Sequence, residues 1–125
     1  RQFTGQGNER ILANLVELGR TLRASPHPPA LWVRTPLIPG ATATPENLGG
    51  IAAFLSEHLD GLVERWELCA FNNLGRDKYR RLGLAWEYAA APLMTRAELD
   101  VCRDWALATG WDPRRVQVTG AARIE

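Results

Sequence analysis

The chain has 125 residues, of which 46% are hydrophobic, and its 15 basic side chains nearly balance its 14 acidic ones. This length and composition predict one globular domain, residues 1–125, rather than two. The small net charge does not favour a nucleic-acid partner, and no apolar run reaches the about 20 residues that span a bilayer. No signal peptide opens the sequence, so we expect a cytoplasmic protein without a membrane partner.

The first predicted element is a helix that Asn8 caps and that ends before the prolines of "SPHPP". Apolar residues recur along it at spacings of four, three and four, as on a helix that lies on a core. The apolar run from Ala30 to Ile38 is too short for a helix and predicts a buried strand. The stripe of the helix consists of Ile11, Leu15, Leu18 and Leu22.

A second helix is predicted to begin at Thr44 and Pro45, an N-cap residue followed by a first-turn proline, and to end at Gly61. The run from Val63 to Phe71 alternates between apolar and polar residues and predicts a second strand. The segment "NNLGRDKYRRLG" that follows is polar and predicts a loop, in which Arg76 to Arg81 form a solvated basic run. The stripe of the second helix consists of Leu48, Ile51, Ala52, Leu55 and Leu59.

Thr95 and Glu98 form a capping box that predicts a third helix, and "RVQVTG" predicts a short last strand. The alternation of helix and strand predicts an α/β fold with about three parallel strands and three helices joined by right-handed crossovers. Three such helices cover one face of a sheet, whereas parallel strands normally have both faces covered. Either the open face lines a barrel with further strands, or the chain associates with another surface. The third apolar stripe consists of Leu99, Cys102, Trp105 and Ala106.

The predicted first strand carries one charge, Arg34, in the middle of "LWVRTPLIPG". Because side chains alternate along a strand, Arg34 shares a face with Trp32 and Ile38, opposite the face that helices would cover. An ionised arginine in such a place requires an anionic partner. One candidate is a neighbouring carboxylate such as Glu67, and the other is the carboxylate of a ligand. Arg34 lies toward the carboxyl end of its strand, where parallel α/β folds bind their ligands.

Several segments resemble the glycyl-radical-enzyme activating enzymes, radical S-adenosylmethionine (SAM) proteins similar to pyruvate formate-lyase activating enzyme. The segments are "NERILANL", "VRTPLIPG", "TPENLGGIAAFL" and "ELCAFNNLGRDKYRRLG", and the resemblance runs from about Phe3 to Gly120. The combination of Arg-x-Pro-x-x-Pro-Gly with Leu-Gly-x-x-Lys-Tyr-x-x-Leu-Gly is its most specific part. The sequence begins at Arg1 without a methionine, so we expect a C-terminal fragment of such an enzyme.

The resemblance implies a partial parallel (β/α)6 barrel of which this chain supplies the C-terminal portion. Such enzymes bind a [4Fe-4S] cluster through a CxxxCxxC motif, and reductive cleavage of SAM yields a radical that removes a hydrogen atom from a backbone glycine of a partner. The implied partners are a glycyl radical enzyme such as pyruvate formate-lyase and an electron donor such as flavodoxin or ferredoxin.

The resemblance assigns cofactor-binding roles to two residues, Arg34 and Asn72, at which SAM would bind. Asn72 stands where the family often has a histidine, and it is equally a candidate turn residue. Lys78 and Tyr79 match the family signature, as packing residues or as contacts to the glycine loop of the protein substrate.

The CxxxCxxC motif is absent from these 125 residues, and Cys69 and Cys102 are too far apart to replace it. We therefore expect both cysteines to be small core residues, no catalytic or metal-binding residue in the chain, and no activity of the fragment alone.

Two alternatives remain. One is a different radical SAM enzyme that acts on a small molecule, and the other is a non-catalytic α/β interaction module in which Arg34 is paired internally. The module would bury Arg34 against a protein carboxylate and cover the face that carries Trp32. A truncated barrel would leave an apolar face open, with Trp32, Ile38 and Leu68 on it, through which the fragment self-associates.

Overall fold

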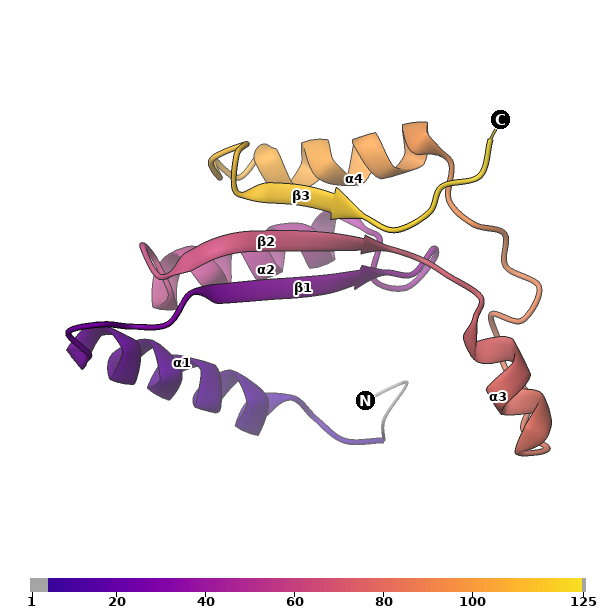
Figure 1. The fold of residues 1–125 in the computed structure, drawn as a ribbon, viewed down its shortest axis with the longest axis horizontal. Coiled ribbons are helices and arrows are strands. Elements are labelled where there is room, and N and C mark those ends of the chain that lie inside the picture. The colour runs from indigo at the N-terminus through magenta and orange to yellow at the C-terminus, as the bar shows by residue number, and fades with distance from the viewer. Residues whose placement is uncertain (1–4, 125) are drawn as a thin grey trace.

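The computed structural model describes residues 5–124, so Phe3 and Thr4, at the start of the resemblance, lie outside the described residues. It contains one parallel sheet in the order β1-β2-β3 (Figure 1). The strands are β1 (Leu31–Leu37), β2 (Val63–Ala70) and β3 (Val116–Thr119). The predicted α/β fold with three parallel strands is therefore confirmed, and the larger barrel stays a prediction.

Helices α2 (Pro45–His58) and α4 (Arg96–Leu107) lie at the predicted positions and cover the rear face of the sheet in Figure 1. The Thr44 hydroxyl accepts a hydrogen bond from Asn47 N and caps α2, as an N-cap threonine does. At α4 both halves of the predicted capping box form: Thr95 N donates to the Glu98 carboxylate, and Glu98 N donates to the Thr95 hydroxyl.

Helix α1 (Glu9–Ala24) is present, but the predicted cap and stripe are partly wrong. Asn8 occupies the N-cap position without a side-chain cap hydrogen bond, and Ile11 is 62% exposed. The helix instead approaches α2 through Gly19, where an added Cβ would lie only 2.7 Å from the carbonyl oxygen of His58. The close approach turns Gly19 and Leu22 inward and rotates Ile11 and Leu18 toward solvent.

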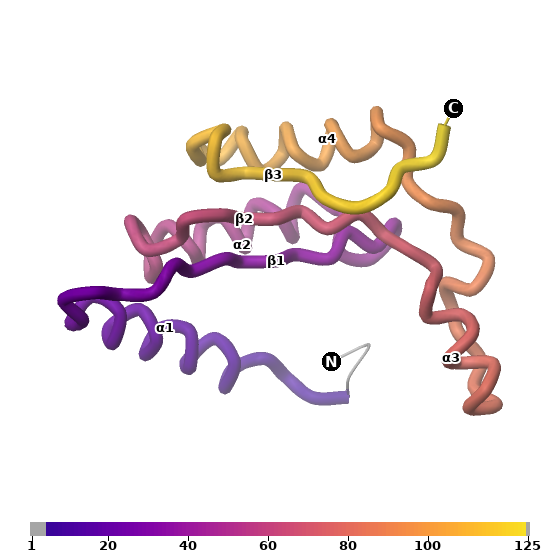
Figure 2. The backbone as a smooth tube through the Cα atoms, viewed as in Figure 1, coloured from indigo at the N-terminus to yellow at the C-terminus, as the bar shows by residue number. Residues whose placement is uncertain are grey.

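A fourth helix, α3 (Gly75–Arg81), occupies the segment that was predicted as a loop. It was missed because it is one short helix with no buried residue and therefore no apolar period. Asp77 forms ion pairs with Arg80 and Arg81 along its exposed side, in agreement with the predicted solvated run. Figures 1 and 2 show α3 beyond the carboxyl ends of the strands, away from the body of the sheet.

The two faces of the sheet differ sharply in burial. On the helix-covered face Leu37, Trp66 and Leu68 are fully buried, so the placement of Leu68 on the open face was wrong. On the opposite face Trp32 is 49% exposed, as expected for a sheet covered on one side by this chain. Within residues 5–124 no helix is long and apolar enough to cross a membrane.

The two cysteines lie in different environments. Cys102 is buried in α4, as predicted, and burial raises the pKa of its thiol. Cys69 is only half-buried on the open face of β2, so its assignment to the core was wrong. The reason is alternation: Leu68 and Ala70 take the covered face and turn Cys69 to the other.

Candidate functional site at the carboxyl ends of the strands

A pocket of about 510 Å³ lies where β1 and β2 end. Its lining includes Arg34 from β1, Cys69 from β2, Asn72 from the following turn and Tyr79 from α3. Three of the four predicted site residues are thus brought together by elements that are distant in sequence. Lys78 is not among the lining residues and is exposed on α3.

Arg34 pairs with Glu67, its direct neighbour in the register of β1 and β2. Arg34 Nε donates a hydrogen bond to Glu67 Oε2 over 2.8 Å. The Arg34 side chain is 66% exposed, whereas that of Glu67 is only 9% exposed. Of the two partners left open by the sequence, the internal carboxylate is therefore present, although it does not bury the guanidinium.

Glu67 also interacts with a second arginine on the same face. Arg65 Nη1 donates to Glu67 Oε1 over 3.3 Å, and the Arg65 guanidinium lies 4.0 Å from the centre of the Trp32 ring. Two guanidinium groups and one carboxylate leave this cluster with one positive charge in excess. The open face of the sheet can therefore bind one further anion at this cluster.

The neighbours of Arg34 favour its charged form. The nearby Cys69 sulfur, and then the hydrogen-bonded Glu67 carboxylate, raise the pKa of Arg34 above its ordinary value. A guanidinium is charged at physiological pH in any case, and these neighbours favour the same charged form, which is the one that binds an anion.

Asn72 begins a turn directly after β2. Its Oδ1 accepts a hydrogen bond from Leu74 N over 3.2 Å, the pattern of an Asx turn. The turn interpretation of Asn72 is confirmed by this contact. The same turn places the residue at the pocket, so its assignment as a SAM contact stays a prediction.

Aromatic rings form a second wall of the pocket. Tyr79 stacks on Trp86 with ring centres 5.5 Å apart, and Phe71 lies 6.2 Å from Trp86 and 6.1 Å from Tyr88. Trp86 and Tyr88 were not predicted as site residues because they lie in an irregular segment between α3 and α4, where no periodicity marks a face. The signal in the sequence that could have predicted them is that Phe71, Trp86 and Tyr88 all lie within ten positions of Tyr79, a predicted site residue.

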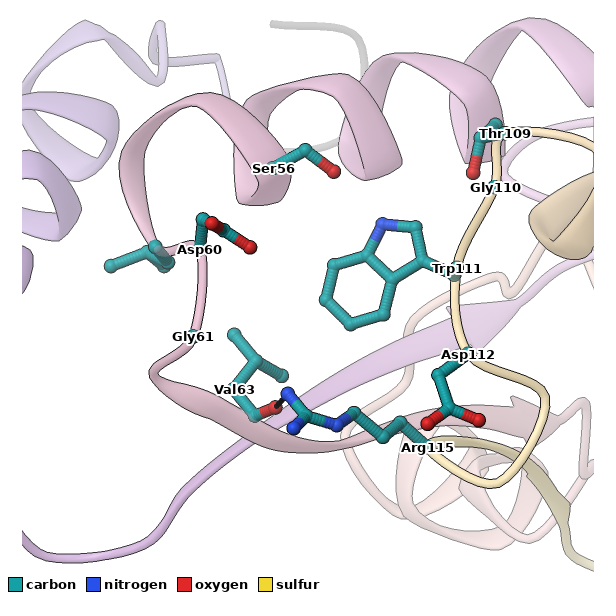
Figure 3. Close-up of a pocket in the computed structure, with 10 residues that line it drawn as sticks. Ser56, Asp60, Gly61, Val63, Thr109, Gly110, Trp111, Asp112 and Arg115 are labelled. Carbon is teal, nitrogen blue, oxygen red and sulfur yellow. Dashed lines mark hydrogen bonds between the residues drawn. The ribbon is translucent and has the colours of Figure 1, made fainter.

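A second pocket, of about 250 Å³, lies at the opposite, amino ends of the strands (Figure 3). The Trp111 ring occupies its centre in the picture, and Trp111 Nε1 donates to the Ala52 carbonyl oxygen over 3.4 Å. Arg115 Nη1 donates to Val63 O over 3.0 Å. These contacts hold connecting loops in place, at the end of parallel strands that in α/β folds serves stability rather than chemistry.

A metal-cluster ligand set is missing from the described part of the chain. Among residues 5–124 no group of three or more histidine, cysteine or acidic side chains is arranged to hold a metal ion. Cys69 faces the open side of the sheet, and Cys102 is buried under the other side. The residues present here therefore do not fit a [4Fe-4S] cluster, which requires several cysteine thiolates together.

No protein-family model matches the chain. It is 34% identical over 88 residues to the indoleacetate decarboxylase activating enzyme of Tractidigestivibacter scatoligenes, covering 70% of this chain and 25% of the relative. It is 31% identical over 110 residues to the 4-hydroxyphenylacetate decarboxylase activating enzyme of Clostridioides difficile, covering 88% and 33%. A third relative, the (2S)-3-sulfopropanediol dehydratase activating enzyme of Klebsiella oxytoca, is 30% identical over 87 residues, covering 70% and 26%.

The chain spans about a quarter to a third of the length of these curated relatives. All three are glycyl-radical-enzyme activating enzymes of the radical SAM class, so the resemblance carried by "VRTPLIPG" and "LGRDKYRRLG" is confirmed. Over the shared length, this chain is similar to the activating enzymes of glycyl radical enzymes.

Proposed function

We propose that this chain is the C-terminal part of a radical SAM activating enzyme that generates a glycyl radical on a partner enzyme such as pyruvate formate-lyase. In this proposal residues 1–125 contribute the last strands of a partial (β/α)6 barrel. The relatives support the general class, because each of the three is an activating enzyme. The open face of the sheet, with Trp32 half-exposed, is consistent with a barrel interior.

The observation that carries the proposal is the presence of Arg34 and an aromatic wall in one pocket at the carboxyl ends of parallel strands. SAM has a carboxylate and an adenine ring. A guanidinium fork pairs well with a carboxylate, and aromatic rings provide faces on which a nucleobase stacks. The excess positive charge of the Arg34, Arg65 and Glu67 cluster favours one bound carboxylate.

The cofactors of the proposed whole protein are SAM and a [4Fe-4S] cluster, whose chemistry is the one-electron cleavage of SAM. In this proposal the cluster ligands lie outside residues 5–124, because the described residues do not fit the cluster. Within this chain, Arg34 binds the SAM carboxylate and Asn72 contributes a polar contact beside it. We expect the 125-residue chain alone to bind no iron and to cleave no SAM after anaerobic reconstitution.

Contacts to the protein substrate are proposed for α3. Tyr79 lines the pocket, and Lys78, its neighbour in the sequence, is exposed on the same short helix. We assign both residues to the entry of the partner's glycine loop. The electron donor in this proposal is a flavodoxin or a ferredoxin.

A second candidate function is a non-catalytic interaction module. The observation that favours it is the internal ion pair of Arg34 with Glu67, which gives the strand charge a partner without any ligand. The half-exposed Trp32 opposes it, because a self-contained module would cover that face with its own residues.

Arg34→Ala in the full-length protein tests the proposal. SAM affinity should fall about tenfold or more, since a charged hydrogen-bonding partner of the carboxylate is lost. The iron content and the visible absorbance of the cluster should stay unchanged. Arg96→Ala serves as the matched control, because Arg96 is an equally exposed arginine paired with Asp100 on the opposite side of the sheet. Equal SAM affinity in the Arg34→Ala and Arg96→Ala proteins would contradict the assignment.

A further inference from the structure

The open face of β1 and β2 carries cross-strand pairs of unusual chemistry. Trp32 lies opposite Arg65 and Arg34 lies opposite Glu67 in the parallel register. Contacts connect these four side chains in one row, from the Trp32 ring through Arg65 and Glu67 to Arg34. Glu67 stands at the centre of the row and touches both arginines.

The burial of Glu67 needs an explanation beyond a surface ion pair. Its side chain is only 9% exposed, while the Arg34 side chain is 66% exposed. A carboxylate with so little access to water is costly unless charged or hydrogen-bonding groups compensate it. Both of its oxygens are engaged, Oε2 by Arg34 and Oε1 by Arg65. Glu67 is thus held firmly, whereas Arg34 extends from it toward the pocket.

The atom of Arg34 that Glu67 contacts determines which edge of the guanidinium is left for a ligand. A guanidinium can bind a carboxylate through Nε and one terminal nitrogen, or through its two terminal nitrogens. Glu67 accepts from Nε over 2.8 Å, so the first of these edges is occupied. A ligand carboxylate that reaches Arg34 must therefore use the terminal nitrogens.

We propose that Glu67 is a positioning residue for ligand recognition by Arg34. By accepting from Nε it fixes the direction of the guanidinium and presents the terminal nitrogens to the pocket. By neutralising one of two arginine charges it leaves one positive charge, which suits a single carboxylate better than a phosphate or pyrophosphate group. This inference rests on the proposed binding of SAM at Arg34 and adds a determinant of selectivity to it.

Trp32 and Arg65 support the same arrangement from the other side. The Arg65 guanidinium packs over the Trp32 ring at 4.0 Å, which restricts its motion and orients it toward Glu67 Oε1. Glu67 is thereby prevented from turning toward solvent. This row of four side chains explains why the half-exposed Trp32 lies on the same face of the sheet as Arg34.

The test measures SAM affinity calorimetrically in the full-length protein, with inorganic pyrophosphate as a second probe. Glu67→Ala should lower the affinity for SAM about tenfold, because the Arg34 guanidinium is no longer held in one direction. It should raise the affinity for pyrophosphate, because the cluster gains one net positive charge. Glu67→Gln keeps an oxygen acceptor for Nε, so SAM affinity should largely recover while pyrophosphate binding still rises. A merely structural role of Glu67 would weaken both ligands together, and that result would overturn the inference.

A double-mutant cycle separates this inference from the proposed function. In the Arg34→Ala background, Glu67→Ala should cause no further loss of SAM affinity, since Glu67 acts through Arg34. Additive losses would overturn the inference while leaving Arg34 as a SAM contact. No effect of Arg34→Ala on SAM would instead refute the proposed function. If Glu67→Ala does not fold, the same cycle is measured with the nearly isosteric Glu67→Gln and with pyrophosphate as the ligand. A Glu67→Gln protein that binds pyrophosphate no more tightly than the wild type would overturn the inference.

Discussion

The indole Nε1 of Trp66 donates a hydrogen bond to the Thr35 hydroxyl over 3.0 Å, inside the helix-covered core. Both residues are buried, and their hydrogen bond links β2 to β1 through side chains. The Trp66 ring also meets Trp111 edge to face at 5.3 Å. A buried indole N–H needs such a partner, so Thr35 is a polar residue that the core requires.

Thr35→Val should therefore destabilise the protein although it makes the core more apolar. The change leaves the Trp66 N–H without its acceptor, and we expect the free energy of unfolding to fall by about 1–3 kcal/mol. Urea denaturation followed by tryptophan fluorescence measures the loss. Thr35→Ser keeps the hydroxyl and is the control, so a serine variant as unstable as the valine variant would attribute the effect to packing instead.

Gly19 allows α1 to approach the C-terminal end of α2. A Cβ at this position would meet the backbone oxygen of His58 at 2.7 Å, and Gly19→Ala should therefore lower stability by forcing the helices apart. Gly49 lies inside α2 with no atom within 4 Å of its added Cβ, so Gly49→Ala should raise stability by about 0.5–1 kcal/mol. Shifts of thermal midpoint with opposite signs confirm the packing, and a stabilising Gly19→Ala would contradict it.

The capping box of α4 predicts a pH-dependent stability. Hydrogen bonds from the Thr95 backbone and hydroxyl lower the pKa of Glu98 below its ordinary value of 4.5. Because the folded-state pKa is the lower one, this stabilisation is present above about pH 4.5 and is lost as the pH falls through the folded-state value. Glu98→Gln should reduce stability at pH 7 and make it depend less on pH between 5 and roughly 3.

Thr95→Ala removes the other half of the same capping box. We expect a loss of about 0.5–2 kcal/mol at pH 7 in denaturant unfolding. Thr21→Ala is the matched control, because the Thr21 hydroxyl donates to the Glu17 carbonyl oxygen on the exposed side of α1 and caps no helix. Equal losses in the two variants would argue against a capping role.

Self-association of the 125-residue chain is expected through the open face of the sheet. Trp32 is the large exposed side chain on that face, and Trp32→Glu should shift a concentration-dependent oligomer toward monomer in sedimentation velocity. Leu74→Glu is the control, since Leu74 is 80% exposed but lies in the turn before α3. A wild-type chain that stays monomeric at all concentrations would contradict the expectation.

Local patterns predicted those elements whose own residues contain a strong signal. Thr44 and Pro45 mark the start of α2, and the capping box of Thr95 and Glu98 marks the start of α4. Alternation along β1 placed Arg34 on the open face correctly. These features need no knowledge of distant residues, because capping and alternation are set by neighbours in the chain.

The aromatic wall of the pocket and helix α3 could not be predicted from such local patterns. Trp86 lies in an irregular segment, and its ring stacks on Tyr79 because the chain reverses its direction after α3, where Leu84 N donates a hydrogen bond to the Tyr79 carbonyl oxygen. Helix α1 shows the same limit: its apolar stripe includes Ile11, yet contact with α2 at Gly19 decides which side faces inward.

The sequence by itself determined that this protein has parallel strands with a charge, Arg34, on the face away from the helices. It also determined the similarity to activating enzymes, since the motifs are short contiguous stretches. Only the tertiary structure decided which carboxylate meets Arg34. The register of β1 and β2 brings Glu67 opposite it, because parallel strands joined by a helix pair residues 33 positions apart, and no local pattern sets that distance.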